Sequence, residues 1–167
     1  MDKLQWIKEL VRAEQQMEES GIVDFTAGFD PQTSLQPETI DFLTSLKTHF
    51  LESANAFNQL KASTLGRIKI YGISKTEADF MIFRNGFKLI FTMRAPGKIA
   101  VAFNHLGSSY IPGQEAGQSA GKTQDEDLLV SKWGAFGDLV WTFQDQEIKP
   151  EYLVRHYLSR FIRESAK

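Results

Sequence analysis

The stretch AGQSAGKT, at residues 116–123, comes nearest to a known chemical motif. It ends in Gly-Lys-Thr, as does the phosphate-binding loop G-x-x-x-x-G-K-S/T, in which backbone amides and the lysine hold nucleotide phosphates. Ala116 replaces the first glycine of that pattern, and no apolar strand precedes it, although a working loop joins a strand to a helix N-terminus. We therefore expect an ordinary Gly-rich loop, and keep nucleotide binding through Lys122 and Thr123 as an alternative.

The histidines are the other candidates for chemistry. His49, His105 and His156 are isolated, and no two have the i, i+4 spacing of a helical metal site. His105 ends an apolar run, and Ser109 and Tyr110 follow it, so these three residues are candidates for a ligand site at one end of a sheet. The sequence lacks the G-x-S-x-G elbow of serine hydrolases. We expect no catalytic residue, no metal and no cofactor, which favours a protein that is not an enzyme.

An acidic run follows the Gly-rich stretch. Asp125, Glu126 and Asp127 are consecutive, but the D-x-D/N-x-D/N-G pattern of a calcium loop is absent. We expect this run to be a solvated group of charges.

The composition excludes several classes of protein. The chain has 167 residues, no cysteine and a net charge of −2. Disulfides, thiol nucleophiles and Cys-ligated metals are therefore excluded, and no basic field favours nucleic acid. The first 20 residues contain no uncharged apolar run typical of a signal peptide, and no segment reaches the ~18 apolar residues of a transmembrane helix. These features predict a cytoplasmic protein with no transmembrane segment.

The segment 77–94, EADFMIFRNGFKLIFTMR, is the strongest structural signal in the chain. Asn85-Gly86 lies between two β-rich runs and predicts a type I′ hairpin turn, because both residues tolerate positive φ. That turn places Arg84 opposite Phe87, Ile82 opposite Leu89, Phe80 opposite Phe91 and Glu77 opposite Arg94. One face then carries core residues, namely Ala78, Phe80, Ile82, Phe87, Leu89, Phe91 and Met93. The other face is mixed, and its residues Met81, Phe83, Lys88 and Ile90 are candidates for an interaction surface.

The same hairpin combines aromatic and basic residues, as RNA-binding sheets do. However, FRNGF is not the signature of that domain, and the register directs most of the aromatic rings to the core. We expect no nucleic-acid binding.

The remaining elements follow from hydrophobic periodicity and turn residues. We expect helices at 3–19, 37–61 and 150–164, with Pro37 opening the second helix, and strands at 67–73, 98–106, 128–133 and 138–143. A loop at 21–36 is expected to be pinned to the core by Phe25 and Phe29. A second, flexible Gly-rich loop is expected at about 107–127.

These elements predict one α+β domain over residues 1–167. Two N-terminal helices precede an antiparallel sheet of about five to six strands in meander order, and a C-terminal amphipathic helix packs on the sheet. The favoured function is a non-enzymatic binding or regulatory domain that acts through contact with a protein partner or a second copy. One alternative is a carrier or sensor of a small apolar ligand held between sheet and helices. The other is a nucleotide binder that uses residues 116–123.

Overall fold

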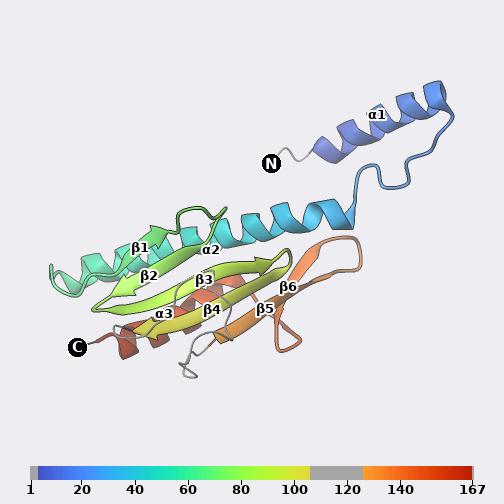
Figure 1. Ribbon diagram of the computed structural model, residues 1–167. Coiled ribbons are helices and arrows are strands. Elements are labelled where there is room, and N and C mark those ends of the chain that lie inside the picture. Colours follow the sequence, from blue (N-terminus) through green and yellow to red (C-terminus); the bar gives the residue numbers. More distant parts are fainter. Residues whose placement is uncertain (1–3, 106–125, 167) are drawn as a thin grey trace.

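The computed structural model describes residues 4–105 and 126–166 and has an α+β architecture (Figure 1). The helices are α1 (Gln5–Ser20), α2 (Pro31–Lys61) and α3 (Pro150–Glu164). The strands are β1 (Lys69–Gly72), β2 (Phe80–Arg84), β3 (Phe87–Ala95), β4 (Lys98–His105), β5 (Glu126–Trp133), β6 (Leu139–Phe143) and β7 (Gln146–Glu147). They form one antiparallel sheet in the order β1 to β7. The predicted α+β meander is thus confirmed, with β7 as an additional short strand.

The β2–β3 hairpin has the predicted turn and register. Arg84 pairs with Phe87, and the pairing continues to Phe80 and Phe91. Asn85 and Gly86 have φ angles of 52° and 84°, which is the backbone that a type I′ turn requires. The predicted core face is also confirmed, since each of its seven residues lies in the hydrophobic core or packs against it.

The core lies between the sheet and two helices. Figure 1 shows α2 and α3 on the same side of the sheet. The buried side chains of α2 and α3 form one cluster with the inward residues of the strands. At its centre the Phe91 ring stacks on Phe80 at 4.9 Å and approaches Phe50 at 5.1 Å and Tyr157 at 5.9 Å. The four rings join α2, β2, β3 and α3, so they stabilise the packing of both helices on the sheet.

Helix α2 begins six residues earlier than the sequence predicts. Pro31 is its first residue, and Asp30 caps it by accepting a hydrogen bond from the Gln32 amide at 3.1 Å. Pro37 lies inside the helix and does not open it. Both prolines fit the rule that proline belongs near a helix start, but only Pro31 follows a residue whose side chain caps the helix.

The loop before α2 is anchored by one of the two phenylalanines that were expected to pin it. Phe29 packs edge-to-face on Trp133, with ring centroids 5.2 Å apart, and lies against Gly137 in the β5–β6 turn. Phe25, in contrast, is 93% exposed, so the prediction that it packs on the core is wrong.

Two buried polar side chains connect α2 with the sheet. Asn58 donates to the Ile68 carbonyl and accepts from the Ile68 amide, both at 2.9 Å, just before β1. Thr39 accepts a hydrogen bond from the Gly97 amide at 2.8 Å, in the β3–β4 turn. These bonds satisfy backbone groups that would otherwise be buried without partners, so they fix where α2 lies along the sheet.

The end of β3 near the β3–β4 turn has a different pairing from the one predicted. The pairing of β3 with β4 is irregular between Met93 and Ala95, and Arg94 forms an ion pair with Glu126 of β5. The paired residues of β2 and β3 stop at Phe80 and Phe91, so the expected pairing of Glu77 with Arg94 is wrong. The bulge redirects Arg94, because an extra residue locally increases the twist of a strand.

Asp79 lies beside this bulge and accepts a hydrogen bond from the Met93 amide at 2.9 Å. Burial raises the pKa of the Asp79 carboxyl above its ordinary value of 3.8, although this hydrogen bond opposes the shift. The folded protein therefore binds the Asp79 proton more tightly than the unfolded chain does. The charge of Asp79 consequently lowers stability above the raised pKa, and this cost disappears below about pH 3.8, where both states are protonated.

We expect Asp79→Asn to raise the midpoint of thermal unfolding at pH 7, because asparagine keeps the acceptor for Met93 and removes the charge. The gain over wild type should shrink as the pH falls toward 3.8. Calorimetry of both proteins across this pH range measures it. Glu147→Gln, at an exposed carboxylate, is the control, and a gain that persists undiminished in acid would contradict the account.

Candidate functional site

The ligand-site residues expected from the sequence lie mostly outside the described residues. This is true of Ser109, Tyr110, Lys122 and Thr123, so ligand binding and nucleotide binding through them stay predictions. His105 is the last residue of β4, where it pairs with Phe87.

The predicted interaction surface lies on the sheet face opposite α2 and α3. Met81, Phe83 and Lys88 are half-buried there, and Ile90 is only 1% exposed. The role of this surface in partner binding stays a prediction. Two other features of the structure are candidate functional sites.

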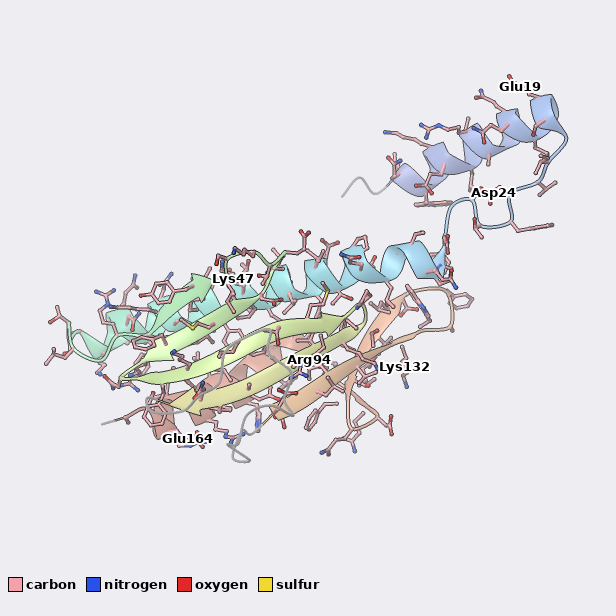
Figure 2. The ribbon with its side chains drawn as sticks, in the orientation of Figure 1. Glu19, Asp24, Lys47, Arg94, Lys132 and Glu164 are labelled. Carbon is pink, nitrogen blue, oxygen red and sulfur yellow. The ribbon has the colours of Figure 1, made fainter. Side chains whose placement is uncertain are left out.

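The first feature is the apolar side of α1. Trp6, Leu10, Ala13 and Met17 recur at helical spacing along one side of this helix. Nevertheless α1 has no buried residue, and Trp6 is 50% exposed. Figure 1 shows α1 apart from the layer of α2 and the sheet, and Figure 2 shows Glu19 at the end of α1 that lies farther from the sheet. The apolar side of α1 therefore packs on no other element of the described chain.

The segment after α1 gives it a defined position. Gly21 closes α1 with a left-handed conformation, and its amide bonds to the Met17 carbonyl at 2.8 Å. Gly28 then lies against Leu10, since a Cβ at position 28 would be 3.2 Å from the Leu10 Cγ. The next residue, Phe29, is the one that packs on Trp133. The helix is thus connected to the β5–β6 end of the sheet through this short segment.

Apolar residues outside α1 are exposed as well. Ile22, Val23 and Phe25 follow α1 and are exposed, and Phe136 is fully exposed in the β5–β6 turn. We call α1 together with Ile22, Val23 and Phe25 the N-terminal apolar surface. Large contiguous apolar patches are rare on monomeric proteins and usually mark binding sites, so this concentration of exposed apolar residues makes the segment a candidate contact surface.

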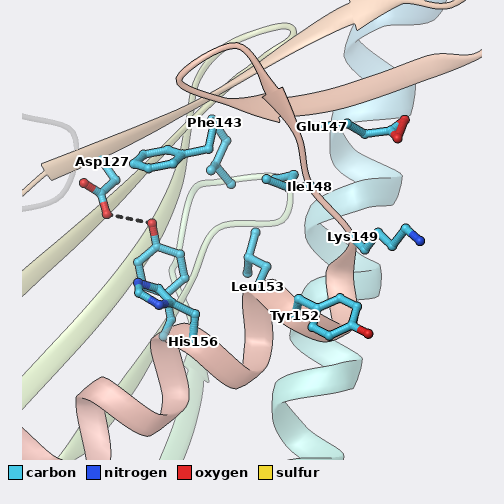
Figure 3. A pocket seen from close by; sticks show the side chains of 10 residues that line it. Asp127, Phe143, Glu147, Ile148, Lys149, Tyr152, Leu153 and His156 are labelled. Carbon is cyan, nitrogen blue, oxygen red and sulfur yellow. Dashed lines mark hydrogen bonds between the residues drawn. The ribbon is translucent and has the colours of Figure 1, made fainter.

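The second feature is a pocket of about 510 Å³ between the N-terminal half of α3 and strands β5 to β7 (Figure 3). Leu129, Ile148 and Leu153 form an apolar floor. Glu147, Lys149 and Tyr152 lie at its exposed rim. Its volume falls within the range of small-molecule sites, about 300–1,000 Å³.

One polar pair lies at the far end of this pocket. The Tyr157 hydroxyl donates a hydrogen bond of 2.7 Å to Oδ2 of Asp127 (Figure 3). Phe143 and His156 border the same end, and the His156 ring meets Tyr157 edge-to-face at 5.1 Å. Of the run expected to be solvated, Glu126 is exposed, Asp127 is half-buried and hydrogen-bonded, and Asp125 lies outside the described residues.

Little in the sequence indicates this pocket. Asp127 and Tyr157 are 30 residues apart, and they meet only because β5 and α3 pack together. The one available signal was the position of Asp127 at the start of an apolar strand, where alternation places it on the same face as Leu129.

The described segments contain no group of three or more His, Cys, Asp or Glu side chains that could hold a metal ion. Nor does any described helix have the length and hydropathy needed to cross a bilayer.

Comparisons with known proteins identify no relative. No protein-family model matches the chain, and neither a curated protein nor a solved structure matches it.

Proposed function

We propose that the protein is a non-enzymatic binding domain that acts through protein–protein contact, and that the N-terminal apolar surface makes this contact. The observation that carries the proposal is the exposure of an amphipathic helix that has no buried residue. An amphipathic helix of 16 residues gains most of its stability by packing its apolar side, so an unpacked one implies a partner.

The charge of α1 favours a protein over a membrane. The helix contains two basic residues, Lys8 and Arg12, and four glutamates. Helices that lie on membranes are rich in lysine and arginine, because lipid headgroups are commonly anionic. A net negative helix is repelled by such a surface, whereas a groove or helix on another protein can accept its apolar side.

The segment after α1 supports the same function. Asp24 accepts hydrogen bonds from the Thr26 amide and hydroxyl at 2.9 and 2.8 Å, and these bonds lower the pKa of its carboxyl. Phe25 is exposed in this turn, whereas Gly28 lies against Leu10 and Phe29 packs on Trp133. An ordered turn that presents an exposed aromatic residue suits a contact surface, since aromatic residues dominate binding energy at interfaces.

Photo-crosslinking in cells that naturally contain the protein tests the proposal. A benzophenone side chain at Met17, on the apolar side of α1, is expected to form a covalent adduct with a protein. The same group at Gln16, the preceding residue, which lies on the polar side with Arg12 and Glu9, should give little adduct. The mass of the adduct shows whether the partner is a second copy or another chain.

A second substitution links the adduct to the apolar surface. Trp6→Ser should reduce the adduct at Met17, while Arg12→Ser on the polar side should leave it unchanged. Equal yields from Met17 and Gln16, or no protein adduct from Met17, would contradict the proposed function.

A further inference from the structure

We infer that the pocket beside α3 binds a small amine, with its ammonium group at Asp127 and its apolar body on the floor formed by Leu129, Ile148 and Leu153. This inference goes beyond the contact proposed for α1, because no α1 residue lines the pocket. It also gives a specific chemistry to the carrier or sensor alternative that the sequence left open.

The carboxylate of Asp127 provides the charge. Its Oδ2 accepts the hydrogen bond from Tyr157, which fixes the orientation of the group. Among residues 4–105 and 126–166, no donor is hydrogen-bonded to its Oδ1, and no lysine or arginine lies within ion-pair distance of Asp127. A half-buried, oriented carboxylate without a cationic partner is suited to bind an ammonium group, because charge-assisted hydrogen bonds are about twice as strong as neutral ones.

The aromatic rings around Asp127 add to this preference. Phe143, Tyr157 and His156 border the same end of the pocket (Figure 3). The face of a phenyl or phenol ring attracts a cation through its quadrupole, and the attraction grows when water is excluded. Asp127 is itself half-buried, and a charge interaction is stronger where less water screens it.

The rest of the pocket selects an apolar body. Leu129 and Leu153 are buried, and Ile148 is half-buried, so the floor beyond Asp127 offers no hydrogen-bonding side chain. The ionisable groups at the rim, Glu147 and Lys149, have opposite charges and point away from the floor in Figure 3. A ligand that lies on the apolar floor is therefore expected to interact with the charge of Asp127 and not with those of the rim.

Three compounds with the same chain and different headgroups test the inference. Titration calorimetry on the full-length protein would use n-octylammonium, 1-octanol and octanoate, each below its micelle-forming concentration. We expect n-octylammonium to bind about tenfold more tightly than 1-octanol, because it adds an ion pair and cation–π contacts. Octanoate should bind most weakly, since Asp127 repels it.

Two substitutions locate the amine in the pocket. Asp127→Asn keeps an acceptor for the Tyr157 hydroxyl and removes the charge, so it should weaken n-octylammonium binding about tenfold and leave 1-octanol unchanged. Phe143→Leu keeps an apolar side chain and removes the ring, and should weaken the amine about threefold. Glu151→Gln, at an exposed carboxylate of α3 that does not line the pocket, is the matched control and should leave every affinity unchanged.

Several results would overturn the inference. They are equal binding of the three headgroups, the absence of binding by all of them, and an amine affinity that Asp127→Asn does not change. If the thermal midpoint of Asp127→Asn shows that this variant is unfolded, Phe143→Leu decides, and an unchanged amine affinity in that variant would contradict the inference. None of these results affects the crosslinking test of α1.

Discussion

Replacing Phe91 with alanine is expected to lower the free energy of unfolding by about 3–5 kcal/mol, the usual cost of removing a buried phenylalanine ring. Phe91 is fully buried, and its ring contacts Phe80, Phe50 and Tyr157. These neighbours come from three different elements, so they cannot all move to fill the cavity. The loss therefore includes a cavity term in addition to the lost apolar burial.

Urea unfolding followed by circular dichroism measures this effect. Phe136→Ala is the matched control, because Phe136 is fully exposed and the same atoms are removed. It should change the free energy of unfolding by less than about 0.5 kcal/mol. Similar losses in the two variants would show that the rings around Phe91 are not the centre of the core.

The second large effect is expected at Arg84, a buried arginine at the β2–β3 turn. Its guanidinium donates to the Gly66 carbonyl at 2.8 Å, and to the Ile162 carbonyl and the Ser165 hydroxyl at 3.1 and 3.3 Å. The neighbouring Asn85 donates to the Ser165 carbonyl at 2.7 Å. The turn thereby holds the C-terminal end of α3, whose carbonyls favour a positive charge.

Arg84→Met should lower the free energy of unfolding by about 3 kcal/mol, because it leaves buried carbonyl groups without donors. Arg84→Lys should fall between wild type and methionine, since lysine keeps the charge but cannot reach several acceptors at once. Hydrogen exchange should show faster exchange at the end of α3 near Ser165. Arg67→Met, at an exposed arginine next to Gly66, is the control and should change neither stability nor exchange.

The local features of the fold were predictable from sequence because nearby residues determine them. The Asn85-Gly86 turn sets its own backbone angles, and the turn then fixes the register of β2 against β3. Helix α3 was predicted to the residue, since Pro150 starts it and its apolar residues recur at a helical period. In both cases the information is contained in fewer than 20 consecutive residues.

Features that depend on competition between similar local signals were predicted less well. Pro31 and Pro37 both suit a helix start, and the capping hydrogen bond of Asp30 decides in favour of Pro31. Phe25 and Phe29 are equally apolar, and among the described rings only Phe29 has a partner, Trp133. That partner is 104 residues away in the chain, so no local pattern could reveal it.

The sequence by itself determined the α+β class, the meander order, the core face of the hairpin and the amphipathic character of α1 and α3, because local periodicity and turn chemistry encode them. Only the tertiary structure decided which amphipathic helix is buried. α3 packs on the sheet while α1 does not, although their patterns are alike. It also decided that Asp127 meets Tyr157, because contacts between distant residues arise from the packing of whole elements. The N-terminal apolar surface and the pocket beside α3, on which the proposed functions rest, both depend on the tertiary structure.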